Sequence, residues 1–102
     1  MENQNSIFVD VDGCLDLAGV ANAKLIAWLR VQRAAGYELT LWSMQGANHA
    51  RRMAERYGVT DLFAAIISKP RMIIDDHGWL WCRFSRWVPL NDIYDGEKLP
   101  TL

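Results

Sequence analysis

The stretch IFVDVDG, residues 7–13, decides how this chain folds. Its apolar residues predict a β-strand over residues 6–11, which includes Asp10 and stops beside Asp12. Side chains alternate between the two faces of a strand, so Asp10 and Asp12 are expected to point the same way. Two carboxylates on one face repel each other unless a cation or a proton lies between them. The alternative is a plain Asp-Gly turn that closes the strand.

Three later apolar runs also read as strands, and each stops at a polar residue. They are residues 38–43, ending at Ser43; residues 64–68, followed by Lys69; and residues 72–75, ending at Asp75 beside Asp76. Ligands of open α/β sheets bind outside the carboxyl ends of the strands, so these side chains are expected to converge with Asp10 and Asp12. Taken alone, Ser43 is a commonplace strand end and Lys69 a typical solvated residue. Adjacent acids after a buried strand are costly without a cation.

The segments between these strands have the spacing of helices. One helix is expected over residues 20–35, where Gly36 can end it in the left-handed conformation. A second helix is expected over residues 47–57, followed by Gly58. Strands that alternate with helices predict an α/β fold with a parallel sheet built from βαβ units.

Length and composition restrict the class of protein. A chain of 102 residues has room for one domain, and its net charge of −1 gives no general attraction to nucleic acid or to an anionic membrane. Cys14 and Cys82 form no close-spaced metal motif and are expected to be free thiols. The polar N-terminus lacks the pattern of a signal peptide, and no apolar stretch approaches the roughly 18–20 residues that span a bilayer. A cytoplasmic protein is expected.

The C-terminal part, residues 79–102, differs in composition and is predicted to be an aromatic-rich strand or arm. Alternation would place Trp79, Trp81 and Trp87 on one face, together with Arg83. Interleaved Arg and Trp side chains can stack on nucleobases. The favoured interpretation is a strand that packs on the sheet or on a second copy of the chain, because aromatic residues and arginine are enriched at such interfaces.

The order of acid pair, hydroxyl, lysine and second acid pair resembles the four motifs of the haloacid dehalogenase (HAD) superfamily of phosphohydrolases. The resemblance covers about residues 6–78. Lys69-Pro70, followed shortly by Asp75-Asp76, is similar to small capless HAD-like phosphatases of bacteria and phages. The chain departs from the usual pattern of the family in three respects. The second motif reads Ser43-Met44-Gln45 where Thr-x-Arg is usual, Cys14 stands where many members have threonine, and the interval from Lys69 to Asp75 is slightly short.

The resemblance implies a small doubly wound parallel sheet in one HAD-like domain, residues 1–102, without a cap. The intervals between Asp12 and Ser43 and between Ser43 and Lys69 are too short to hold a folded cap domain. An open site would suit a bulky or macromolecular substrate, or one enclosed by the tail or by a neighbouring subunit.

The resemblance also implies a Mg²⁺-dependent phosphatase that acts through an aspartyl-phosphate. Asp10 would be the nucleophile, and Asp12 would protonate the leaving oxygen and then activate water. Ser43 and Lys69 would bind the transferring phosphoryl group. The metal ligands would be these residues: Asp10, Asp12 through its backbone carbonyl, Asp75, and Asp76 as a ligand or an outer partner. Mg²⁺ prefers such oxygen ligands.

Two alternatives remain at this point. The first is a phosphate- or nucleotide-binding module with weak or no turnover, and the presence of both Asp10 and Asp12 argues against it. The second is a phosphatase that processes nucleic-acid ends. The near-neutral charge counts against tight binding to a nucleic-acid backbone. The basic and aromatic tail keeps this alternative open.

Overall fold

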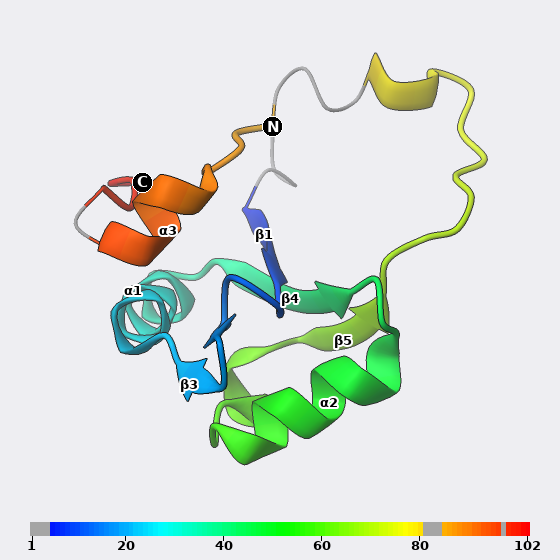
Figure 1. The fold of residues 1–102 in the computed structure, drawn as a ribbon. Helices are drawn as coiled ribbons and strands as arrows, with labels where there is room; N and C mark the ends of the chain where they lie inside the picture. The colour runs from blue at the N-terminus through cyan, green and yellow to red at the C-terminus, as the bar shows by residue number, and fades with distance from the viewer. Residues whose placement is uncertain (1–4, 81–84, 97) are drawn as a thin grey trace.

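A parallel sheet of three strands forms the centre of the computed structural model, which describes residues 5–80, 85–96 and 98–102 (Figure 1). The strands are β1 (Ser6–Asp10), β4 (Glu38–Ser43) and β5 (Ala65–Ser68), in the order β1-β4-β5. β4 is central, and its Leu41 lies opposite Val9 on one side and Ile66 on the other. The predicted α/β fold with a parallel sheet is therefore confirmed.

Two helices connect these strands and cover one face of the sheet. They are α1 (Ala23–Ala34) and α2 (Ala47–Arg56). Leu39 and Leu41 share a face because they are two residues apart on β4, and both are fully buried. They pack in one apolar cluster with side chains from both helices: Leu25, Leu29, Ala50 and Ala54. None of the helices in the described residues is long and apolar enough to cross a membrane.

The opposite face of the sheet carries a smaller aromatic group. Phe8 and Trp42 belong to adjacent strands and meet edge to face, with 4.7 Å between their ring centroids. Phe8 is 48% exposed and Ile67 of β5 is 38% exposed, so this face is much less covered than the one beneath α1 and α2.

A short hairpin stands where only a turn was predicted. β2 (Asp16–Leu17) pairs in antiparallel fashion with β3 (Val20–Ala21), and α1 begins later than expected, at Ala23. Ala18 and Gly19 both have positive φ angles, 53° and 89°, as a two-residue hairpin turn of the right twist requires. Asn22 then caps α1, because its side-chain oxygen accepts the Leu25 N–H.

The strand predicted over residues 72–75 is wrong. After β5 the chain leaves the sheet and runs outward as an extended loop (Figure 1). Residues 71–80 are all exposed, and Ile74 keeps 94% of its surface in solvent. Pro70 lacks a backbone N–H and disfavours continuation of the ladder. An apolar run has strand propensity, but the run does not specify a partner strand.

The C-terminal part is an arm with a helix rather than a strand. Residues 81–84 of the predicted strand lie outside the described residues, and residues 85–89 have no regular secondary structure. α3 (Leu90–Asp95) follows in a segment that was predicted to be a loop, and it ends at Gly96. Ile93 packs against the core, and Trp28 of α1 donates its indole N–H to the Pro100 carbonyl at 2.8 Å.

Candidate functional site

The carboxyl ends of the three parallel strands lie together at one edge of the sheet. Asp10 ends β1, Ser43 ends β4, and Lys69 directly follows β5. The Lys69 backbone N–H donates to the Ser43 carbonyl at 2.9 Å, which continues the pairing of β4 and β5 by one residue. Four of the predicted site residues, Asp10, Asp12, Ser43 and Lys69, therefore belong to this edge or to the turns that leave it.

Asp10 and Lys69 form an ion pair. The Lys69 Nζ lies 3.3 Å from Asp10 Oδ1, and both side chains are about one-third exposed or less, at 33% and 29%. The same Nζ lies 5.5 Å from the centre of the Trp42 ring, which places the cation over an aromatic face. A carboxylate and an ammonium are thus held side by side while both remain accessible to a ligand.

Asp12 has different partners. Gln45 donates from Nε2 to Asp12 Oδ2 at 2.7 Å, and His49 Nε2 lies 3.2 Å from Asp12 Oδ1. Neither Gln45 nor His49 was selected from the sequence: Gln45 was noted as a departure from the family pattern, and His49 matches no metal spacing. One sequence signal could have found them. They are four residues apart at the start of the helix that follows Ser43, and this spacing can place both side chains on the same side of the helix.

Cys14 lies beside the nucleophile candidate. Its Sγ is 4.0 Å from Asp10 Oδ2. Burial, and then the negative charge of Asp10, raise the pKa of the Cys14 thiol to about 11, although Lys69 acts in the opposite direction. Since the thiolate is the reactive form of cysteine, Cys14 is protonated at neutral pH and is not a nucleophile there.

Ser43 is the least accessible of the predicted residues. It is 1% exposed, and its Oγ accepts the Gln45 N–H at 3.0 Å. Ser68 acts similarly one strand away, because its Oγ accepts the Ala47 N–H at 2.9 Å, at the start of α2. The two hydroxyls hold the turn that leads into α2, and contact between Ser43 and phosphate stays a prediction.

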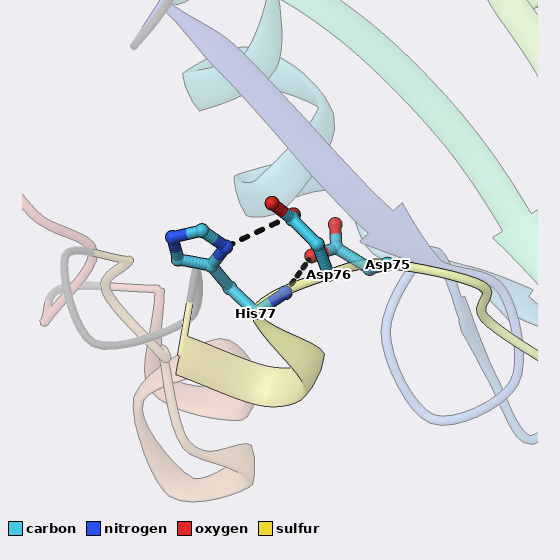
Figure 2. Close-up of side chains that lie close together, drawn as sticks. All are labelled: Asp75, Asp76 and His77. Carbon is cyan, nitrogen blue, oxygen red and sulfur yellow. Dashed lines mark hydrogen bonds and ion pairs between the residues drawn. The ribbon is translucent and has the colours of Figure 1, made fainter.

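Asp75 and Asp76 both contact the next residue along the chain, His77 (Figure 2). They lie with His77 on the exposed segment, where Asp76 Oδ1 is 2.9 Å from His77 Nδ1 and Asp75 Oδ1 accepts the His77 N–H at 2.8 Å. These three form a local cluster of possible metal ligands, all within 4.8 Å. Within the part of the chain that the structure describes, no cluster of three such side chains contains Asp10 or Asp12. The convergence of the two acid pairs on one metal ion stays a prediction.

A cleft of about 450 Å³ opens next to the Asp10–Lys69 pair. Its size falls within the roughly 300–1,000 Å³ that is usual for small-molecule sites. Asp10, Asp12 and Lys69 are its charged residues, and most of its remaining lining is apolar. Its larger side chains include Phe8, Trp28, Leu29, Trp42 and Trp87, which come from β1, α1, β4 and the C-terminal arm.

No family of known proteins matches this chain, and neither a curated protein nor a solved structure matches it. The chemistry of the site is therefore argued from its own residues.

Proposed function

We propose that this chain is a Mg²⁺-dependent phosphomonoesterase with a HAD-like core and no cap. The observation that carries the proposal is the ion pair of Asp10 with Lys69, 3.3 Å apart, at the carboxyl edge of a parallel sheet. A carboxylate suits nucleophilic attack on phosphorus, and an adjacent ammonium offsets the charge of the phosphoryl oxygens. Asp12, close by in the same cleft, is suited to a separate role as acid and base.

The donor set at this edge fits Mg²⁺. This ion commonly takes one or two protein carboxylates and completes its shell with water and substrate phosphate oxygens. Asp10 and the backbone carbonyl of Asp12 would hold it, and it would lower the repulsion between an anionic nucleophile and an anionic substrate. Asp75 and Asp76 lie on the exposed segment, so the proposal does not require them as ligands.

The reaction would follow two steps, formation of an aspartyl-phosphate and its hydrolysis. An Asp10 oxygen attacks phosphorus and forms an acyl-phosphate bond, while the bond from phosphorus to the leaving oxygen breaks and Asp12 gives that oxygen its proton. Asp12, now ionised, takes a proton from water. The resulting hydroxide attacks phosphorus, which releases inorganic phosphate and restores the Asp10 carboxylate. Throughout, Lys69 faces the equatorial oxygens of the phosphoryl group.

The test is hydrolysis of p-nitrophenyl phosphate with and without Mg²⁺, in the parent and in Asp10→Asn. Activity should require the metal, and kcat should fall by more than about a thousandfold in the variant, because the amide cannot form the intermediate. Asp61→Asn is the matched control, since Asp61 is an exposed acid paired only at the surface with Arg30.

Two results would contradict the proposal. An Asp10→Asn protein that keeps most of the activity would exclude the proposed nucleophile. An inactive parent, across a panel that includes phosphorylated oligonucleotides, would favour a phosphate-binding module. Asp75→Asn, assayed over a range of Mg²⁺ concentrations, should leave the half-saturating concentration unchanged if Asp10 and Asp12 suffice.

A further inference from the structure

Two side chains that contact Asp12 come from the turn before α2 and from the first turn of that helix. Gln45 reaches one carboxylate oxygen and His49 reaches the other, at 2.7 Å and 3.2 Å. We propose that Gln45 and His49 are positioning residues that hold the Asp12 carboxylate where it can exchange a proton with the leaving oxygen. This inference rests on the phosphatase function proposed above.

Asp12 needs such support because of where it lies. It stands two residues beyond the end of β1, and its side chain is 47% exposed. A half-exposed carboxylate in a turn is free to rotate unless its oxygens are held. Contacts to both oxygens fix the plane of the carboxylate as well as its position, which a single contact does not do.

The groups that hold Asp12 are themselves anchored to the sheet. The Gln45 N–H is bonded to the buried Ser43 hydroxyl at 3.0 Å, and the Ala47 N–H is bonded to the Ser68 hydroxyl at 2.9 Å. Gly46 makes the turn with a φ of 103°, a conformation that favours glycine. Gln45 and His49 are thus placed by the ends of β4 and β5.

Asp10 and Asp12 have different partners, which suits the different roles proposed for them as nucleophile and as acid and base. Asp10 is paired with the Lys69 ammonium, whereas Asp12 is held by an amide and an imidazole. A proton donor must come within about 2.6–3.2 Å of the atom that receives the proton. A displacement of about 1 Å at an active site can cost on the order of a hundredfold in rate. Loss of the two contacts should therefore impair proton transfer more than substrate binding.

The experiment uses two substrates that differ in their need for an acid. p-Nitrophenolate leaves without protonation, whereas the alkoxide of glycerol 2-phosphate requires a proton. In Gln45→Leu and His49→Leu, kcat/KM for glycerol 2-phosphate should fall about ten- to a hundredfold, a part of the roughly 10²–10⁴-fold that general acid–base catalysis supplies. With p-nitrophenyl phosphate, kcat/KM should fall less than about threefold, because kcat/KM covers only the steps up to departure of the leaving group. Where the attack of water limits turnover, kcat should fall with both substrates, because Asp12 also activates that water.

A second arm tests whether the effect acts through Asp12. Adding Gln45→Leu to Asp12→Asn should cause no further loss with glycerol 2-phosphate, because the carboxylate that Gln45 positions is already gone. His49→Gln keeps an N–H donor near the position of Nε2 and should recover most of the lost rate. Arg52→Ala is the control on α2, since Arg52 is exposed on the same helix and is assigned no role at the site.

Each outcome is decisive. Equal losses in kcat/KM with both substrates, or a full additional loss from Gln45→Leu in the Asp12→Asn background, would overturn the positioning role and leave the phosphatase function standing. A parent protein without Mg²⁺-dependent hydrolysis would overturn both. If a leucine variant has a lowered melting temperature, His49→Gln supplies the comparison, and failure of this variant to exceed His49→Leu in rate would also overturn the role.

Discussion

Asp10 and Asp12 are two residues apart in the sequence, yet their surroundings differ. Asp10 contacts Lys69 and lies beside the Cys14 thiol, whereas Asp12 contacts Gln45 and His49. The fully buried Val11 between them turns its side chain into the core, so the two carboxylates are held on the other side of the chain. A pair of like charges is tolerated because each has partners of its own.

The reactivity of the Cys14 thiol tests its burial and its contact with Asp10. In a Cys82→Ser background without added metal, alkylation of Cys14 by iodoacetamide should be slow at pH 7 and should rise about tenfold per pH unit towards its pKa of about 11. The pKa is raised, so the reactive thiolate appears only at high pH. In Asp10→Asn the midpoint should move to lower pH, because a negative charge that disfavours the thiolate is removed. A midpoint near 9.0, the ordinary value, would contradict the burial and the contact with Asp10.

A hydrogen bond between distant elements attaches the β2–β3 hairpin to the end of α2. The Tyr57 hydroxyl, at the end of α2, donates to an Asp16 carboxylate oxygen on β2. This hydrogen bond raises the pKa of Tyr57, because the protonated phenol is the form that donates. The turn after β1 carries Asp12 and leads directly into β2. The attachment of the hairpin to α2 therefore helps fix the position of Asp12.

Tyr57→Phe should loosen the hairpin without disturbing the core. Hydrogen exchange of the amides over residues 16–21 should become faster, because the hairpin loses its bond to α2, while exchange in β4 should be unchanged. Mass spectrometry of peptide fragments measures both regions in one experiment. Equal protection of the hairpin in the parent and in the variant would show that the hydroxyl contributes nothing to its attachment.

Large apolar side chains are exposed on two segments of the molecule. Met72, Ile74 and Trp87, on the segment after β5 and on the C-terminal arm, are 74%, 94% and 84% exposed. Isolated exposed apolar residues are normal, but a sequence of large ones is typical of a surface that binds a partner. A second copy of the chain is the partner proposed from the aromatic tail.

Trp87→Ala tests this proposal in solution. Sedimentation should show an oligomer for the parent protein and a shift towards the monomer for the variant, because a large exposed ring of the arm is removed. Tyr94→Ala is the control, since Tyr94 is an exposed aromatic residue on α3. An identical mass distribution for parent and Trp87→Ala would exclude this interface.

Local pattern was enough for much of the sheet and for one helix. The strands expected over residues 38–43 and 64–68 are β4 and β5, and the helix expected over residues 47–57 is α2. Apolar alternation and terminal glycines are properties of neighbouring residues, so they can be read without knowledge of the fold. The placement of Asp10 and Lys69 at one edge followed from the same patterns, because parallel strands end on the same side.

Contacts between distant residues required the folded chain. The bonds from Gln45 and His49 to Asp12 join residues 33 and 37 positions apart, and the hairpin contact spans 41. An apolar run such as residues 72–75 has strand propensity, yet it forms a strand only if a partner lies beside it, and here it lies exposed. Propensity and periodicity belong to short stretches of sequence, whereas partners are chosen by the packing of the whole chain.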